Sequence, residues 1–178
     1  MCLILFVHRA HPRYRLILAA NRDEWFDRAT APAGFWPDRP AILAGRDLEQ
    51  HGTWLGLTRG GRFGAITNFR DPGANRAGAR SRGHIVRDFL EDGGPAQAFG
   101  CSLATDGGAF NGFNFLGGDG REVVYYSNRA GPPIAVTPGV HGLSNHLLDT
   151  DWPKVVNGKT RLAALAAHKR AQPPYRGD

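Results

Sequence analysis

Cysteine, lysine and long apolar runs are scarce in this sequence of 178 residues, and each scarcity excludes a class of protein. The two cysteines, Cys2 and Cys101, cannot build a disulfide-stapled scaffold. The longest unbroken apolar run extends only from Cys2 to Val7, whereas a membrane-spanning helix needs about 20 apolar residues. We therefore expect no membrane span. Because this run is also too short for the core of a signal peptide, we expect a cytoplasmic protein.

Sequence motifs for metals, phosphate loops and nucleic acids are also missing. The seven histidines form no His-Glu-x-x-His pattern and no Cys-x-x-Cys pair occurs, so we expect no metal site and no required cofactor. No long Lys/Arg run occurs, so we expect no nucleic-acid partner. The net charge is nevertheless +6, its excess lies within residues 1–90, and all but three of the 22 basic residues are arginine. Arginine suits recognition of carboxylate and phosphate, which favours a small anionic or amphipathic ligand.

The turn-forming residues, 24 glycines and 12 prolines, favour short strands joined by turns over a helical bundle. Branched apolar segments predict strands over 2–8, 15–20, 53–58, 62–68, 112–116, 122–127 and 134–137. Helices are predicted over 81–90 with Ser81 as N-cap, over 95–104 with Cys101 in the core, and over 153–169. Three prolines predict a loop over 30–40. This order predicts an α+β fold with mostly antiparallel sheets, in a single domain 1–178 that ends in a basic, proline-rich tail at 169–178.

Cys2 is a candidate nucleophile because it follows the initiator methionine directly. Removal of Met1 would leave a thiol beside a free α-amine, and such an amine can act as the base that activates its own nucleophile. A thiol also ionises more readily than a serine hydroxyl. The competing interpretation is a small buried residue at the start of a core strand.

A second candidate is the polar tetrad Asn21-Arg22-Asp23-Glu24, which follows the strand predicted over 15–20. Asp23 or Glu24 could orient an attacking group, and Arg22 could bind a carboxylate. A turn with a local ion pair is the alternative.

Three asparagines, Asn68, Asn114 and Asn145, end or interrupt apolar segments. An asparagine amide can donate to an oxyanion, but it can equally cap a turn. The loop 75–82 carries three arginines that could clamp an anion, although a solvated flexible loop is the alternative: Arg76, Arg80 and Arg82.

Several ordered sequence blocks together resemble the family named for its Asn-Arg-Asp-Glu motif, also called the transport and Golgi organisation protein 2 family. The resemblance covers about residues 1–160, and its blocks are Cys2–Phe6, Leu18–Glu24, Leu43–Asp47, Gly52–Gly56, Ala65–Asn68, Asn111–Asn114, Tyr125–Arg129, Gly142–Asn145 and Trp152–Lys154.

The resemblance implies a fold like that of the N-terminal-nucleophile hydrolases, an αββα sandwich of two stacked sheets between helix layers. It also implies a relation to the branch with an N-terminal cysteine, which hydrolyses linear amides. Carried over by motif, Cys2 would be the nucleophile, Asp23 would orient its amine and thiol, and Asn68 and Asn145 would face the oxyanion or substrate. The substrate-binding candidates would be Arg22, Asn21, Glu24, Trp54 and Asn114.

The same resemblance also implies a non-enzymatic alternative, the carriage of haem, acyl-CoA or a related lipid. Aromatic walls for such a ligand would come from Trp25, Phe26, Trp36 and Trp54, although ordinary core packing is the alternative for these side chains. Similar family members continue beyond position 178 with further strands. We therefore expect a C-terminally incomplete fold whose unpaired strand edges favour a homo-oligomer.

Overall fold

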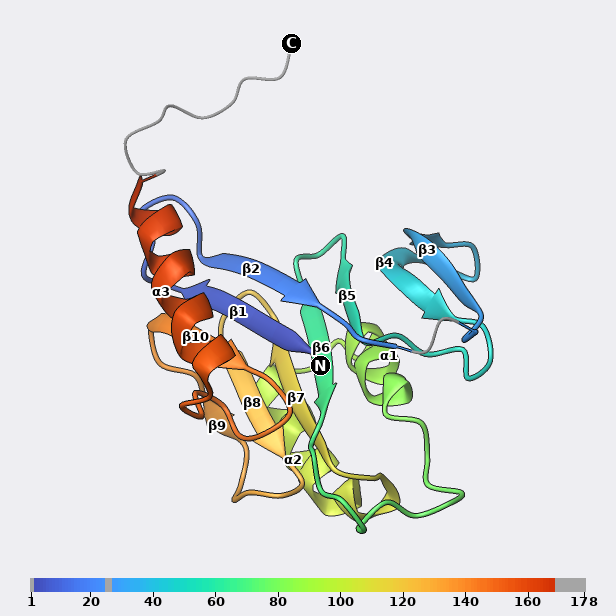
Figure 1. Cartoon of the computed structure of the whole chain (residues 1–178). Coiled ribbons are helices and arrows are strands. Elements are labelled where there is room, and N and C mark those ends of the chain that lie inside the picture. Colours follow the sequence, from blue (N-terminus) through green and yellow to red (C-terminus); the bar gives the residue numbers. More distant parts are fainter. Residues whose placement is uncertain (1, 25–26, 169–178) are drawn as a thin grey trace.

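The computed structural model describes residues 2–24 and 27–168 (Figure 1). Three parts of the sequence discussed above lie outside the described residues: Met1, the aromatic pair Trp25-Phe26, and the tail 169–178. The described chain folds into two antiparallel sheets with three α-helices, so the predicted α+β class with mostly antiparallel pairing is confirmed.

The smaller sheet contains the N-terminal hairpin. Its strands are β1 (Leu3–His8), β2 (Leu16–Asn21) and β10 (Gly139–Leu143), in the order β10-β1-β2. Both pairs are antiparallel, and Ile4 lies opposite Leu143 on one side and Ala20 on the other. The hairpin predicted from the two apolar segments is therefore confirmed, and β2 forms one edge of this sheet.

The larger sheet has seven strands in sequence order, each antiparallel to its neighbour. These strands are β3 (Thr30–Trp36), β4 (Arg39–Asp47), β5 (Leu55–Thr58), β6 (Phe63–Asn68), β7 (Phe113–Gly118), β8 (Val123–Ser127) and β9 (Ile134–Ala135). Sequential antiparallel pairing needs only short turns, which agrees with the high glycine content. Gly61 in the turn between β5 and β6 has a φ of 83°, a conformation that glycine adopts without steric cost.

The two sheets stack face to face, and a helix layer covers each outer face (Figure 1). Phe6 of β1 and Leu116 of β7 belong to the buried cluster between the sheets. The preceding residue on β7, Phe115, points the other way and packs with Phe89 of α1 (Gly83–Glu91). Helix α2 (Ala96–Asp106) lies against β8 on that same side, and a short 3₁₀-helix, η1 (Gly107–Ala109), follows it. Because successive side chains of a strand point to opposite faces, β7 contributes to both apolar cores, the one between the sheets and the one under α1 and α2.

Helix α3 (Pro153–His168) covers β1 and β10 on the outer face of the smaller sheet. Leu5 of β1 points toward it and contacts Gly158, where an added Cβ would lie 2.7 Å from a Leu5 methyl group. The glycine therefore lets the helix approach the sheet closely.

The structure corrects three local predictions. Residues 30–40 are not a loop, because β3 occupies Thr30–Trp36 and pairs with β4. Its single proline, Pro32, is tolerated because β3 is an edge strand whose register is irregular between Ala31 and Gly34, where a missing backbone donor costs no ladder hydrogen bond. Pro37 lies in the turn between β3 and β4, and Pro40 lies near the start of β4. The residue at the N-cap of α1 is Arg82, not Ser81, and Cys101 on α2 is exposed, not part of the core.

Asp149 joins β10 to α3 through hydrogen bonds of its carboxylate. Its carboxylate accepts hydrogen bonds from His141 Nδ1 and Lys159 Nζ, both at 2.7 Å, and from the backbone N–H of Gly142 at 2.9 Å. Burial acts to raise the pKa of Asp149, but these hydrogen bonds outweigh it and hold the pKa below its ordinary value.

Asp149→Asn is expected to lower the free energy of unfolding near neutral pH by about 1–3 kcal/mol, because it removes a charged acceptor from several donors. Because the pKa of Asp149 is lower in the folded state, the stability that its carboxylate contributes is fully present above the unfolded-state pKa of about 3.9. That stability is lost as the pH falls through the lower folded-state pKa. Urea denaturation should therefore separate parent and variant near neutral pH and bring them together in strong acid. Asp151→Asn, at an exposed position two residues away, serves as the control, and an equal loss at both pH values would contradict this account.

Within the part of the chain that the structure describes, no helix has the length and apolar character that crossing a membrane requires.

Candidate functional site

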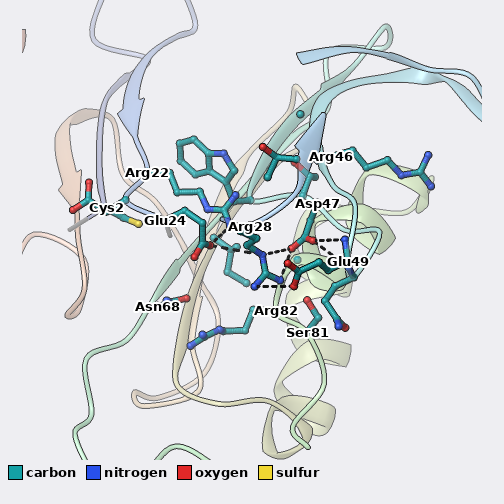
Figure 2. Close-up of a pocket in the computed structure, with 18 of the residues that line it drawn as sticks. Cys2, Arg22, Glu24, Arg28, Arg46, Asp47, Glu49, Asn68, Ser81 and Arg82 are labelled. Atoms are coloured by element: carbon teal, nitrogen blue, oxygen red, sulfur yellow. Dashed lines mark hydrogen bonds and ion pairs between the residues drawn. The ribbon is translucent and has the colours of Figure 1, made fainter. Parts of the chain in front are cut away.

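A cleft of about 900 Å³ lies where the start of β1, the segment after β2, the β3–β4 hairpin and the loop before α1 meet (Figure 2). Six of the sequence-predicted site residues line it: Cys2, Arg22, Asp23, Glu24, Trp54 and Asn68. These residues come from four separate segments of the sequence, which the stacking of the two sheets brings to one place.

Cys2 lies on the wall of this cleft with 8% of its surface exposed. Its backbone carbonyl accepts hydrogen bonds from Ser144 Oγ at 2.7 Å and Lys154 Nζ at 3.4 Å, which anchor the start of β1 to the segments after β10. In Figure 2 the sulfur points toward the side of the cleft that carries Arg22 and Glu24. Burial raises the pKa of the Cys2 thiol, and the positive charges of Arg22 and Lys154 oppose that rise only in part. The thiol is therefore protonated near neutral pH and needs a base to become a nucleophile.

The tetrad that follows β2 carries its own charge pairing. Arg22 forms an ion pair with Glu24, and Glu24 also lies 3.9 Å from the guanidinium of Arg28. Asn21 donates its side-chain amide to Asp23 at 3.4 Å, and Asn21 is not among the residues that line the cleft. The arrangement orients Asp23, Glu24 and Arg22 at the cleft and leaves Asn21 beside it.

Asn68 and Asn145 lie together, but only Asn68 lines the cleft. The side-chain amide of Asn145 donates to the backbone carbonyl of Asn68 at 3.0 Å, and the backbone carbonyl of Asn145 accepts from the N–H of Arg70 at 2.7 Å. Asn145 therefore holds the end of β6 in place, and its own amide is engaged in doing so.

Asn114 lies away from the cleft, fully buried between the two sheets. Its amide nitrogen donates to Thr67 Oγ1 at 3.1 Å and to the carbonyl of His146 at 3.0 Å, and its side-chain oxygen accepts from Tyr125 Oη at 2.9 Å. These contacts link β6, β7, β8 and the segment after β10. They are those of a structural residue, because a buried amide of this kind has no face open to a ligand.

The aromatic wall predicted for an apolar ligand is only partly present. Trp54 lines the cleft, whereas Trp36 is buried in the core with its indole N–H donated to the carbonyl of Ala44 at 3.1 Å. The expectation for Trp36 is thus wrong, and core packing, the alternative, holds for it.

Sequence reasoning missed the acidic and basic groups that β4 and its following turn contribute. Asp47 accepts two hydrogen bonds from Arg28, at 2.6 and 2.8 Å, and further ones from the backbone N–H groups of Glu49 and Gln50. Burial acts to raise the pKa of Asp47, but the bonds from Gln50, Arg28 and Glu49 overcome it, so the pKa lies below its ordinary value. The family block Leu43–Asp47 carried the only available signal for this side of the site.

A close contact between two glycines positions the loop before α1 against the start of β5. A Cβ atom added to Gly52 would lie 2.5 Å from the carbonyl carbon of Gly83, so only glycine allows this approach. The backbone N–H of Thr53 donates to the carbonyl of Gly83 at 3.1 Å. The contact brings Arg82, the residue before Gly83, to the cleft.

Two of the three loop arginines singled out from the sequence, Arg80 and Arg82, line the cleft. The third, Arg76, does not line it, and its guanidinium donates to the carbonyl of Gly108. Residues 2–24 and 27–168 contain no group of three or more His, Cys, Asp or Glu side chains that could hold a metal ion.

The two cysteines provide a direct test of the local environment. Iodoacetamide near neutral pH is expected to modify the exposed Cys101 before Cys2, because Cys2 is buried and its pKa is raised. The rate at Cys2 should continue to rise above the ordinary thiol pKa of about 8.5, because burial raises the pKa of this thiol. Peptide mass mapping over a pH series measures both rates in one sample. Faster modification of Cys2 than of Cys101 near neutral pH would show a stabilised thiolate instead.

Comparison with known proteins agrees with the family suggested by the sequence blocks. Residues 1–174 match the family described as Transport and Golgi organisation 2. The Mus musculus protein named Transport and Golgi organization 2 homolog is 40% identical over 186 residues, which cover 97% of this chain and 67% of the mouse protein. The Homo sapiens homolog is 39% identical over the same shares, and Drosophila melanogaster Transport and Golgi organization protein 2 is 30% identical over 96% of this chain and 67% of its own length. The chain therefore belongs to the transport and Golgi organisation 2 family.

Proposed function

We propose that this protein is an N-terminal-cysteine hydrolase or acyltransferase that acts on a linear amide or acyl group, with Cys2 as the nucleophile. The observation that carries the proposal is the position of Cys2 on the wall of a charged cleft, beside the tetrad arginine and acids and near Asn68. The layer order of helix, sheet, sheet and helices supports a fold like that of the N-terminal-nucleophile hydrolases.

The base in this proposal is the α-amine of Cys2, exposed by removal of Met1. This base is required because burial holds the thiol in its protonated form. The amine takes the thiol proton while sulfur bonds to the carbonyl carbon, and the side-chain amide of Asn68 donates to the resulting oxyanion. Asp23, exposed at the cleft, orients the amine through its negative charge.

The tetrahedral intermediate then collapses. The C–N bond breaks, the proton held by the amine moves to the leaving nitrogen, and a thioester remains on Cys2. Water attacks this thioester, a C–O bond forms, the C–S bond breaks and the thiol regains its proton as the carboxylic acid leaves. An amine in place of water would give acyl transfer with the same balance of bonds and protons.

Carriage of haem or acyl-CoA stays the alternative prediction. It has less support, because charged side chains from five arginines and four acids line the described cleft and Trp54 is its one aromatic wall residue there. Saturable binding of haemin, followed by its Soret band, without turnover of any amide would favour the carrier.

The proposal is tested with the full chain in two steps. Intact mass spectrometry should show that Met1 is absent from the protein as it is made in its own cell. Incubation with N-acetyl, N-butyryl and N-glutaryl p-nitroanilides should then release nitroaniline and leave an acyl adduct on the N-terminal Cys2 peptide. Retention of Met1, or release of nitroaniline without any adduct on Cys2 in rapid-quench samples, would overturn the mechanism.

A further inference from the structure

We propose that Arg82 forms an anion subsite in the cleft, which binds a carboxylate or phosphate group carried by the same small molecule whose acyl bond faces Cys2. This inference deepens the proposed function and rests on it for the identity of the second group. Binding of the anion itself does not depend on turnover.

The first observation is the pairing of the cleft arginines. Arg22 is paired with Glu24, Arg28 with Asp47, and Arg46 with Asp38 at 2.6 Å. Arg80 and Arg82 have no carboxylate within 4 Å among the described residues. The cleft therefore contains positive charge that no carboxylate of residues 2–24 or 27–168 neutralises by direct contact.

The second observation is the position of Arg82. One guanidinium nitrogen donates to the carbonyl of Gly112 at 3.0 Å, which uses part of the donor fork and leaves the rest without a protein acceptor in the described chain. In Figure 2 its guanidinium extends toward the side of the cleft where Asn68 and Cys2 lie. Burial lowers the pKa of Arg82, and the negative charge of Glu24 acts against this effect. A partly desolvated cation held in this way is a preorganised site for an anion.

Arg80 differs from Arg82 and takes a secondary role. It is exposed, and its guanidinium lies 4.9 Å from the centre of the Phe110 ring. It therefore adds positive potential at the rim without directing donors at the same point.

The ligand class follows from the two ends of the site. The thiol of Cys2, which would attack a carbonyl, forms one of these ends. The guanidinium of Arg82, which keeps donors without an acceptor in the described chain, forms the other. The structure thus favours a short acyl compound with an anionic group, such as a dicarboxylic acid monoamide or an acyl compound that bears phosphate, over a neutral fatty amide.

The test measures equilibrium binding on the Cys2→Ala protein, so that no turnover is needed. Glutarate and inorganic phosphate are titrated by calorimetry into Cys2→Ala and into the same protein with Arg82→Gln, Arg82→Lys or Arg87→Gln. Arg87 is the matched control, because it lies on α1, outside the cleft, and is paired with Asp88. Arg82→Gln is expected to weaken binding of the preferred anion by about 10-fold or more, Arg82→Lys by less, and Arg87→Gln not at all.

The relative affinities of glutarate and phosphate identify which anion the subsite takes. Unchanged binding in Arg82→Gln, or an equal loss in Arg87→Gln, would overturn the inference, as would no binding of either anion by the parent protein. Should Arg82→Gln fail to fold, the test uses Arg82→Lys and the salt dependence of anion binding by the parent protein. Added salt should weaken the binding, because it screens the attraction between the anion and Arg82. Binding that is independent of salt would contradict the subsite.

Failure of the proposed function is recognised separately. If the chain hydrolyses none of the p-nitroanilides but loses glutarate affinity on Arg82→Gln, the subsite stands and the nucleophile does not. If it hydrolyses N-butyryl and N-glutaryl p-nitroanilide with equal KM, and Arg82→Gln changes neither, the nucleophile stands and the subsite does not.

Discussion

Cys2→Ala is expected to reduce kcat/KM for a hydrolysed p-nitroanilide by about 10³-fold or more, because the variant lacks the atom that forms the covalent intermediate. The fold should persist, since the change removes one small side chain at the wall of the cleft and leaves the backbone contacts of residue 2 with Ser144 and Lys154 in place. The measurement is initial-rate kinetics of parent and variant, with thermal unfolding of both.

Two further variants make this result specific. Cys101→Ala, on the exposed side of α2, should leave the rate unchanged. Cys2→Ser should be strongly impaired but should still accumulate a detectable acyl ester if an amine base is present, because serine keeps a nucleophilic oxygen at the same position. Full turnover by Cys2→Ala would show that another residue carries the reaction.

Asn114→Ala is expected to lower the free energy of unfolding by about 2–4 kcal/mol. The change leaves Tyr125 Oη, Thr67 Oγ1 and the carbonyl of His146 without their partner in a buried position, and each lost buried partner costs about 1–3 kcal/mol before relaxation. Urea denaturation at constant pH measures the loss.

The control for Asn114 is Asn75→Ala, at an exposed loop position, which should change stability by less than about 0.5 kcal/mol. The same experiment decides between the two roles considered for Asn114. Unchanged stability together with weakened binding of glutarate or a p-nitroanilide would return Asn114 to the binding site. A large loss of stability, with normal binding in the folded fraction, would establish it as a structural link between the sheets.

The strand predictions that succeeded rest on local patterns. The segments that became β1 and β2 are short, branched and apolar, and a proline-containing turn separates them, so their antiparallel pairing follows from near neighbours in the chain. The prediction for residues 30–40 failed because proline is read locally as a breaker. Whether a proline strand is tolerated depends on whether it lies at a sheet edge, and the sequence of that segment does not contain that information.

In the candidate site, too, local motifs predicted some features, whereas others depend on the position of a residue in the packed sheets. The motifs by themselves identified Cys2, the tetrad and Asn68, and all but Asn21 of these line one cleft. No local pattern separates Asn68 from Asn114, since both are asparagines that end or interrupt apolar segments. They differ in their place in the stack: Asn68 ends β6 at the cleft, whereas Asn114 lies inside between two sheets.

The family, the α+β class and the short local elements follow from the amino-acid order, because motif blocks and hydrophobic periodicity are properties of neighbouring residues. Which charges lack an ion-pair partner in the described chain depends on the packing of the two sheets. Arg28 meets Asp47 from 19 positions away, whereas Arg82 meets the carbonyl of Gly112 and no carboxylate in the described chain. Such pairing depends on the distances that the packed sheets impose across the cleft, and charge interactions fall off too steeply with distance for the sequence order alone to reveal them.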